Sequence, residues 1–422
     1  MAEESVLTDD FIRQLINVGE VDILVGLPTH NNANSVGPVI QAIQAGILKC
    51  FPRERAVIIN ADGGSTDGTP DQVTNASIDD VRHAYTGFAL RTLHSISTQY
   101  ANTPSNKTAL QTILAAADLL RAKACAVISP ESTSIESDWI PRLLRPVYQD
   151  NFDFVAPIYR RHKFEGILVK NLVYPMTRAL YGQRVREPYG SEFGFSGRLG
   201  NHFLAQDIWN HESSATGPEM ELSLSAITGG YRICQSFLGT KGHAERDGGD
   251  LVPAIRQTVG VLFSSLEPNF AVWSTKGGSD SVPTTGAEYE TTLDPTQVNR
   301  KRLKEMFSAG VAELGPVYKS ILSASTLAEL QQIMNLSEEH FRYPAELWVK
   351  TVYELAGSYA KSVINRDHII QALAPLYRGR VFTFLVENGG GSAEDVENNI
   401  ETLCRDFERL KPYLLEVWNE GK

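Results

Sequence analysis

The sequence predicts an α/β protein with a mostly parallel sheet in its N-terminal part and an all-helical region at its C-terminus. Short apolar runs alternate with helical patterns through the first half of the chain. From about residue 296 onward, apolar residues recur at spacings of three and four, which is typical of successive amphipathic helices. At 422 residues the chain is also too long for one ordinary core, so we expect more than one domain.

The strand prediction rests on apolar runs that each end in a polar loop. The runs are 22–28, 56–62 and 124–131, and the helical patterns between them are 39–51 and 109–122. This alternation is typical of βαβ units and of a parallel sheet. Ligands of such sheets bind beyond the carboxyl ends of the strands. We therefore expect the functional residues in the segments that directly follow these runs.

The second half of the chain sets the expected domain boundaries. The stretch 153–249 is rich in Gly, Tyr and Arg and less periodic, so we expect its loops to complete the site. Turn-forming and polar residues over 271–295 predict a linker or surface loop. The expected division is a first domain over 1–270 and a helical domain over 296–422. Ser392 predicts the N-cap of the last long helix.

Charge and cysteine content exclude several classes of protein. The formal net charge is -11, which argues against a nucleic-acid or anionic-membrane surface. No apolar stretch approaches ~18 residues and the first residues are acidic, so we expect a soluble, cytoplasmic protein without a membrane span. Cys50, Cys125, Cys234 and Cys404 lie far apart, so we expect buried thiols rather than a disulfide framework or a zinc site.

The most specific signal is a pair of loops, 27–32 after the first run and 60–69 after the next. An acidic residue at a strand end accepts hydrogen bonds from a base or ribose, and glycines let the backbone approach a nucleotide. Alone, the second loop could simply be a tight turn. The two loops in this order and spacing favour nucleotide binding.

These loops resemble those of GT-A glycosyltransferases, and specifically of the retaining glucosyl-3-phosphoglycerate and mannosylglycerate synthase group. The family's P-x-x-N-E loop corresponds to residues 28–32 and its D-x-G-S-T-D-x-T loop to 62–69. The family's G-K-G-x-A-L is similar to 105–110, where Lys107 would offset pyrophosphate charge. The resemblance implies a GT-A fold and a set of donor-binding residues: Pro28, Thr29, His30, Asn31, Asn32, Asp62, Lys107 and Glu131.

A divalent cation, Mg²⁺ or Mn²⁺, is also implied by the resemblance. The family's acidic metal motif corresponds to 129–135, where Glu131 keeps a carboxylate. The family's metal-binding histidine corresponds to His243. A histidine with a carboxylate fits Mg²⁺ or Mn²⁺ better than zinc, because neither a cysteine nor a second histidine is near. For a single histidine, a hydrogen-bonded structural role is the alternative.

The acceptor and the reacting sugar are assigned to two further segments. Residues 189–197 resemble the family's G-G-E-F loop, which implies that Gly190, Ser191 and Glu192 hold the acceptor. Arg184 and Arg186 lie just upstream, and guanidinium groups match planar anions at two points. Residues 217–221 resemble the segment whose first acidic residue lies near the reacting sugar, which here is Glu219. Alternatively, Glu219 and Glu221 are helix N-terminal charges after Pro218.

Together these patterns predict a hexosyltransferase that uses a UDP-, GDP- or ADP-linked donor. The acceptor would be a small anion such as glycerate or 3-phosphoglycerate, and the family implies retention of anomeric configuration. A catalytically diverged nucleotide-sugar-binding protein is the alternative, suggested by Ser129 and Asn106 at positions where relatives carry a carboxylate and a lysine. A nucleotidyltransferase would show a glycine-rich, basic phosphate loop near the N-terminus, and 28–38 does not supply one. The oligomeric state stays open, with a homodimer as one option.

Overall fold

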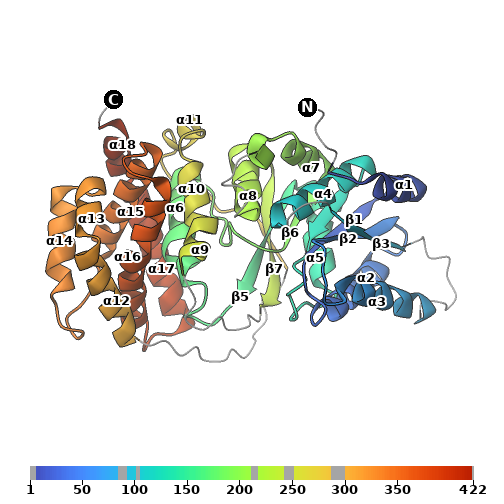
Figure 1. Cartoon of the computed structure of the whole chain (residues 1–422), viewed down its shortest axis with the longest axis horizontal. Coiled ribbons are helices and arrows are strands. Elements are labelled where there is room, and N and C mark those ends of the chain that lie inside the picture. The colour runs from blue at the N-terminus through green and yellow to red at the C-terminus, as the bar shows by residue number, and fades with distance from the viewer. Residues whose placement is uncertain are drawn as a thin grey trace. The chain divides into compact units, whose positions relative to one another are not determined.

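The computed structural model describes residues 6–83, 93–100, 105–210, 217–241, 251–286 and 300–420. These residues form two compact units (Figure 1). The sheet unit contains the described residues within 1–160, 189–245 and 282–291. The helical unit contains those within 161–188, 246–281 and 292–422.

This division differs from the predicted one, which ran linearly through 1–270, 271–295 and 296–422. Residues 161–188 and the described part of 246–281 belong with the C-terminal helices. The reason is apolar packing: Tyr174 lies in one hydrophobic cluster with Phe384, Val396, Ile400 and Cys404. A helical pattern shows which residues of a helix are buried but not which partner buries them.

Parallel strands alternate with helices in the sheet unit, as the apolar runs predict. Its strands are β1 (Ile23–Thr29), β2 (Ala56–Asp62), β3 (Leu93–Gln99), β4 (Ala124–Val127), β5 (Phe154–Arg160), β6 (Phe193–Ser196), β7 (Ile233–Thr240) and β8 (Thr284–Thr285). Its helices are α1 (Asp9–Val18), α2 (Val36–Cys50), α3 (Thr69–His83), α4 (Asn106–Leu119), α5 (Trp139–Tyr148), α7 (Gly197–Leu204) and α8 (Pro218–Thr228), with a 3₁₀ turn at Asp207–Asn210.

The strands form one sheet in the order β3-β2-β1-β4-β6-β5-β7-β8. β6 runs antiparallel to β4 and β5, and the other neighbouring pairs are parallel. The carboxyl ends of β1, β2, β4, β5 and β7 therefore lie at one edge of the sheet, which we call the carboxyl edge. Because β6 is antiparallel, its first residue, Phe193, also lies there. The α/β fold class is confirmed.

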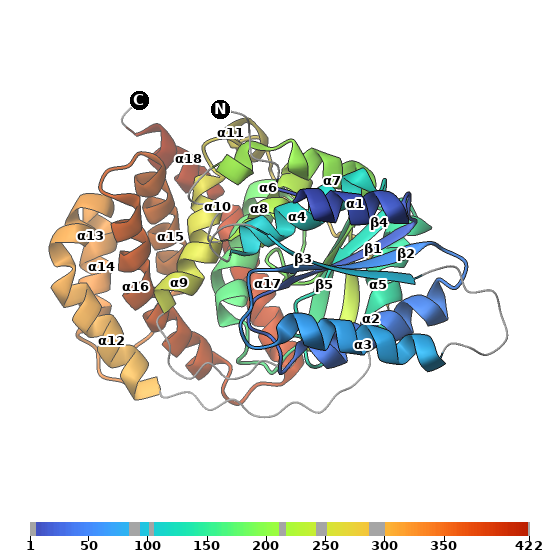
Figure 2. The same ribbon diagram turned by 45° about the vertical axis from the view of Figure 1, so that its right-hand side comes forward.

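Helices cover both faces of the sheet, and this positions the strand ends. Figure 2 shows α1 and α4 on one side of the strands and α2 and α3 on the other. Val25, Ile58 and Ala126 of the strands pack with Ile43 of α2 and Leu143 of α5 in one core cluster. Each large apolar side chain buried in this way contributes about 1.5–3 kcal/mol. Burial on both faces explains why the strands read as continuous apolar runs instead of alternating ones.

In the part of the helical unit that the structure describes, short helices from two inserted segments precede a run of mostly longer C-terminal helices. They are α6 (Tyr174–Tyr181), α9 (Leu251–Ile255), α10 (Val261–Ser264), α11 (Phe270–Trp273), α12 (Arg300–Glu313), α13 (Gly315–Ile321), α14 (Ala324–Met334), α15 (Ala345–Ala360), α16 (Arg366–Glu387), α17 (Ala393–Arg409) and α18 (Lys411–Asn419). Single π-helical turns precede α6 at Val169–Val173 and α10 at Arg256–Gly260.

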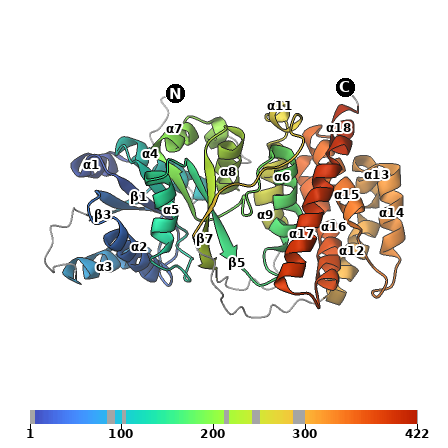
Figure 3. The ribbon, with the colours of Figure 1, turned by 180° about the vertical axis from the view of Figure 1, so that it is seen from behind.

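Close packing between helices is clearest at two places in this unit. α17 packs against α6 (Figure 3), and buried Arg178 of α6 donates to Glu401 at 2.5 Å and to Glu408 at 2.8 Å. α12 and α16 approach each other closely at Gly310, where a Cβ would lie 2.2 Å from Pro375. The predicted N-cap is confirmed: Ser392 and Asp395 form a capping box at the start of α17.

Burial confirms the prediction for three of the four thiols. Cys125, Cys234 and Cys404 are buried, Cys50 is half-buried, and all four are free. Across the described ranges, no helix is both long and apolar enough to cross a membrane.

Gly194 of β6 tests the packing of the sheet. A Cβ at this position would lie 2.3 Å from the carbonyl oxygen of Leu143 in α5, a backbone atom that cannot rotate away. We expect Gly194→Ala to lower the free energy of unfolding by about 1–3 kcal/mol, as overpacking does. Gly37→Ala in α2 is the control, because its Cβ would meet nothing within 4 Å. Equal urea midpoints for the two variants would contradict the close approach.

Candidate functional site at the carboxyl edge

The loops that follow β1 and β2 are bonded to each other at the carboxyl edge. Thr29 Oγ1 donates to Asp62 Oδ1 at 3.0 Å and to Asn60 Oδ1 at 2.8 Å, and the Gly63 N–H donates to the Thr29 carbonyl at 2.8 Å. Further out, the Asn31 N–H donates to Ser65 Oγ at 2.8 Å. The two sequence motifs therefore form one surface.

Asp62 shapes the second loop from within. Its side chain is buried, and its oxygens accept bonds from the Gly64 N–H at 3.0 Å, the Ser65 N–H at 2.9 Å and Ser65 Oγ at 2.6 Å, besides the bond from Thr29. Gly64 has a φ of 79°, which suits glycine. The tight-turn interpretation of this loop is therefore correct in geometry. Donor binding by Asp62 stays a prediction.

Asp67 makes a second tie between the loops. Its carboxylate accepts from Thr69 Oγ1 at 2.6 Å and from the Ala33 N–H at 2.9 Å. Thr69 Oγ1 in turn accepts the Asn32 N–H at 2.8 Å. The hydrogen bond from Thr69, followed by that from Ala33, lowers the pKa of Asp67 below its usual value. The 62–69 loop is thus held at both ends.

The other residues predicted in these loops differ in exposure. Pro28 is half-buried and Asn32 uses its side-chain oxygen to accept the His30 N–H at 2.8 Å. His30 is exposed, with its Nε2 3.2 Å from Asn31 Nδ2. Asn31 has a φ of 55°, a left-handed conformation that asparagine tolerates. His30 and Asn31 are therefore exposed to a ligand of this surface, as are Thr66 and Asp67 of the second loop.

A buried ion pair lies where β5, β6 and β7 reach the same edge. Lys241 Nζ donates to Glu192 Oε2 at 2.7 Å, and both side chains are almost fully buried. Ser132 and Tyr159 also donate their hydroxyl groups to Glu192, and Lys241 lies 3.3 Å from Ser191 Oγ. We call these five residues the Glu192 cluster. It joins the loop after β4 to the ends of β5, β6 and β7.

The protonation state of Glu192 follows from these partners. Burial acts to raise its pKa, but the charge of Lys241 and the hydrogen bonds from Lys241, Ser132 and Tyr159 lower it overall. Glu192 is therefore a carboxylate paired with a cation. Removing one member of such a buried pair typically costs about 3–5 kcal/mol, because the other charge stays buried.

Three members of the Glu192 cluster were missed by the sequence analysis: Lys241, Ser132 and Tyr159. Lys241 directly follows the apolar run of β7, and a charged residue at a buried strand end was the available signal. Ser132 and Tyr159 carry no such signal, because a hydroxyl group in a loop or on a strand is common in any chain.

The amino ends of α4 and α8 bring the predicted residue Glu219 next to Asn106, which stands where relatives carry a lysine. Asn106 Nδ2 donates to Glu219 Oε1 at 2.9 Å. Burial raises the pKa of Glu219, and the nearby charge of Glu192 raises it further against the bond from Asn106. Glu219 is therefore within electrostatic reach of the Glu192 cluster. Its alternative role as a helix N-terminal charge is also met, since it lies in the first turn of α8.

Glu221 of α8 and Lys107 of α4 influence each other electrostatically. Burial raises the pKa of Glu221 to about 7, although the charge of Lys107 opposes this. Burial likewise lowers the pKa of Lys107. Oε2 of Glu221 is buried and has no hydrogen-bond partner within the described part of the chain. Desolvation therefore outweighs the attraction between these two groups.

The two residues predicted to bind metal are not both described. Glu131 is exposed in the turn after β4, where its N–H donates to Ser129 Oγ at 3.3 Å. His243 lies outside the described residues. Among the residues that are described, no group of three or more His, Cys, Asp or Glu side chains could hold a metal ion. The shared metal site stays a prediction.

The residues predicted to bind the acceptor divide between the two units. Gly190, Ser191 and Glu192 belong to the sheet unit, and a Cβ on Gly190 would lie 2.4 Å from Pro157. Arg184 and Arg186 belong to the helical unit. Within that unit their guanidinium groups already have partners. Arg184 donates to Ser279 at 3.1 Å, and Arg186 donates to both oxygens of Glu397 at 2.9 and 2.7 Å.

Glu221 gives a pH-dependent test of this edge. A carboxyl group whose pKa is raised to about 7 in the folded protein binds more protons there than in the unfolded chain between about pH 4.5 and 7. Its burial therefore costs stability increasingly as the pH rises through that range. We expect Glu221→Gln to be more stable than wild type by about 2 kcal/mol at pH 8 and similar to it at pH 4.5.

Thermal unfolding at pH 4.5, 6 and 8 measures this difference. Glu136→Gln, a change at an exposed carboxylate, is the matched control and should follow the wild-type profile. A difference between Glu221→Gln and wild type that stays constant with pH would show that Glu221 does not titrate in this range.

Comparison with known proteins gives similarity to solved structures only. No family model and no curated protein matches the chain. The chain is similar to glucosyl-3-phosphoglycerate synthase from Mycobacterium tuberculosis in complex with Mn²⁺, uridine diphosphate and glucosyl-3-phosphoglycerate. The identity is 19% and the TM-score is 0.42, and the match covers 64% of this chain and 87% of that chain. The complex of that synthase with Mn²⁺, uridine diphosphate and phosphoglyceric acid is 20% identical, with a TM-score of 0.41 over 61% and 82% of the two chains.

Proposed function

We propose that this protein is a glycosyltransferase of the GT-A kind that transfers a hexose from a nucleotide-sugar donor to a small anionic acceptor. One observation carries the proposal. The loops after β1 and β2, which hold the donor motifs, are bonded into one surface at the carboxyl edge, and the acidic side chains of three other motifs, Glu131, Glu192 and Glu219, lie at strand or helix ends on that edge. This is the edge at which parallel α/β sheets bind ligands.

The donor nucleotide would lie on the joined loops. Exposed His30 offers a ring to the nucleoside, and the glycines of the 62–69 loop let a ligand approach the backbone. Asp62 would act on the donor mainly through the loop, because its oxygens already accept bonds from Thr29, Gly64 and Ser65. Lys107 at the start of α4 would contribute positive charge toward the pyrophosphate.

Glu219 is the residue that we assign to the reacting sugar. It accepts a hydrogen bond from Asn106 at 2.9 Å, and burial raises its pKa, so it takes up a proton more readily than an exposed carboxylate does. A neutral carboxyl group can donate a hydrogen bond to a sugar hydroxyl as well as accept one. Transfer with retention is the outcome that the family resemblance implies, and Glu219 would orient the donor sugar for it.

A divalent cation would be held by Glu131 and His243. Glu131 fits this role, because it is an exposed carboxylate in the turn after β4 and hard oxygen ligands suit Mg²⁺ and Mn²⁺. Glu192 does not, because its oxygens are bonded to Lys241, Ser132 and Tyr159. The cation would supply charge neutralisation for the leaving pyrophosphate.

For the acceptor we retain two groups of residues as separate proposals. In the sheet unit, Gly190 and Ser191 lie beside the buried Glu192–Lys241 pair, which fixes the loop that carries them. In the helical unit, Arg186 is paired with Glu397, whose side chain is 54% exposed. The side chain of Arg186 is 29% exposed and its guanidinium lies 4.8 Å from the centroid of the Tyr174 ring, so an anionic acceptor would bind it by replacing Glu397.

The alternative is a protein that binds nucleotide sugars without transferring them. Asn106 favours it, because the amide stands where relatives carry a lysine and is engaged with Glu219. The two functions are separated by incubating the full chain with UDP-, GDP- and ADP-hexoses and with glycerate or 3-phosphoglycerate, with and without a chelator. Products identified by mass spectrometry and NMR support transfer. Donor binding in calorimetry without product supports the alternative, and neither binding nor product rejects both.

Glu131 provides the sharper test of the proposed mechanism. We expect Glu131→Gln to lower turnover by at least tenfold in saturating Mg²⁺ or Mn²⁺, because the change removes a charged metal ligand. The side chain is exposed, so the melting temperature should not change. Glu136→Gln removes a nearby exposed charge and should keep wild-type turnover. Wild-type activity of Glu131→Gln, or full activity of wild type in chelator, would contradict the metal assignment.

A further inference from the structure

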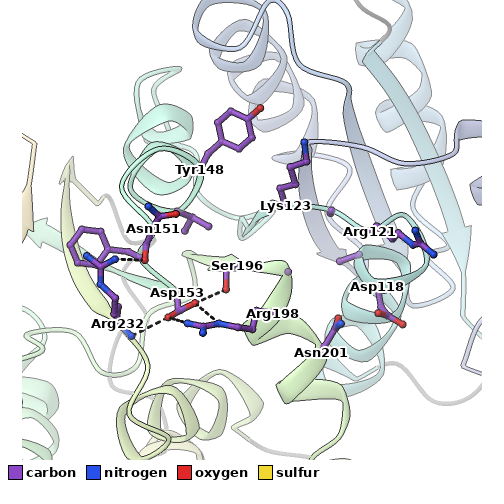
Figure 4. Close-up of a pocket in the computed structure, with 15 residues that line it drawn as sticks. Asp118, Arg121, Lys123, Tyr148, Asn151, Asp153, Ser196, Arg198, Asn201 and Arg232 are labelled. Carbon is purple, nitrogen blue, oxygen red and sulfur yellow. Dashed lines mark hydrogen bonds and ion pairs between the residues drawn. The ribbon is translucent and has the colours of Figure 1, made fainter.

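A cavity lies at the opposite edge of the same sheet, where β4, β5 and β7 begin. This amino-edge cleft has a volume of about 660 Å³ and is formed by residues within 117–123, 147–153 and 196–201 together with Arg232 (Figure 4). Its lining belongs entirely to the sheet unit. None of its residues is used by the proposed transfer reaction. Cavities of this size are typical of sites for small molecules.

A buried carboxylate organises one wall of the cleft. Asp153 is 3% exposed and accepts from Ser196 Oγ at 2.9 Å and from Arg198 at 3.2 and 2.5 Å. Its Oδ2 also accepts the backbone N–H of Arg232 at 3.2 Å. Figure 4 shows these bonds converging on Asp153. One buried anion thus fixes the guanidinium group of Arg198 and the backbone at Arg232.

Arg232 is the group best placed to meet a ligand. Its guanidinium lies over the ring of Phe152, 4.9 Å from the centroid, and one nitrogen donates to the Asn151 carbonyl at 2.9 Å. These contacts fix the plane of the group. The residue is exposed, so its remaining N–H groups are accessible to an anion.

The charge of the lining favours an anion although the chain as a whole has a net charge of -11. The lining contains four basic residues and two acidic ones: Arg121, Lys123, Arg198 and Arg232, with Asp118 and Asp153. Arg121 and Lys123 form surface pairs with Glu20 and Asp22, and the two basic side chains are 79% and 65% exposed. Exposed pairs such as Arg121–Glu20 contribute at most about 1 kcal/mol, so Arg121 can turn to a ligand at little cost. Lys123 would meet a ligand from its position beside Asp22, whose side chain is only 15% exposed.

We propose that the amino-edge cleft is a second binding site, specific for a small phosphorylated molecule. A guanidinium group bonds phosphate oxygens at two points, and the lysine adds a further positive charge. The volume exceeds that of a bare phosphate ion, so the ligand would carry an organic part or a second phosphate. Because the cleft and the carboxyl edge lie at opposite ends of the strands, the ligand would not compete with the donor.

The test uses sodium pyrophosphate as the probe for the full chain at constant ionic strength and without divalent metal. Isothermal titration calorimetry compares wild type with Arg232→Gln, and hydrogen exchange locates the site. We expect saturable binding that Arg232→Gln weakens by about tenfold or more, the loss that follows removal of charge-assisted hydrogen bonds. Exchange should slow in peptides covering 117–123 and 196–201.

Two further variants keep the result interpretable. Arg145→Gln removes an exposed arginine of α5 that does not line the cleft, and should bind pyrophosphate as wild type does. Lys123→Gln should also weaken binding, but less than Arg232→Gln does. This second variant keeps the test valid if Arg232→Gln misfolds, which far-ultraviolet circular dichroism would show. Malonate serves as a dicarboxylate competitor and should bind more weakly.

Several results would overturn the proposal. These are no saturable binding at millimolar pyrophosphate, equal affinity in Arg232→Gln and wild type, equal losses in Arg145→Gln and Arg232→Gln, and protection confined to residues 29–33 and 62–69. Tighter binding of malonate than of pyrophosphate would overturn the assignment to phosphorylated ligands. None of these outcomes depends on glycosyl transfer, so the proposed function can fail while this site stands.

Discussion

The candidate site depends on the hydrogen bonds that the carboxylate of Asp62 accepts. Asp62 ends β2, is buried, and accepts bonds from the neighbouring strand end at Thr29 and from the backbone of its own loop. A buried carboxylate whose oxygens accept no hydrogen bonds destabilises the folded state by several kcal/mol. The chain around Asp62 therefore has few alternative conformations. The glycine-rich loop is therefore ordered by its own first residue, and a nucleotide would meet a surface that is already formed.

The acidic residues of this edge differ mainly in what surrounds them. Glu192 is charged because Lys241 compensates its burial, whereas burial of Glu219 and Glu221 is compensated less and their pKa values rise. Glu131 is exposed to water. Sites that combine an ionised and a neutral carboxyl group can divide charge stabilisation and hydrogen-bond donation between them. The same residue type thus serves several purposes within one edge of the sheet.

The strands of the sheet could be predicted from the sequence because each of them is indicated by its own neighbouring residues. The apolar runs of β1, β2 and β4, the turn residues of 62–69 and the cap at Ser392 each report on their own few residues, and the structure has them as expected. The antiparallel direction of β6 and the transfer of 161–188 to the helical unit depend on partners far along the chain. Lys241 was missed for the same reason, since its role comes from Glu192, which is 49 residues away in the sequence.

The buried thiols have a practical consequence. Burial raises the pKa of Cys234 and of Cys404 to about 12, and that of Cys125 well above its usual value, so these side chains are protonated and shielded from reagents in the folded chain. Cys125 and Cys234 belong to the sheet unit and Cys404 to the helical unit. Alkylation followed by peptide mapping can therefore report separately when each unit opens. The native cysteines can thus serve as the labelling sites in such an unfolding experiment, and none has to be introduced.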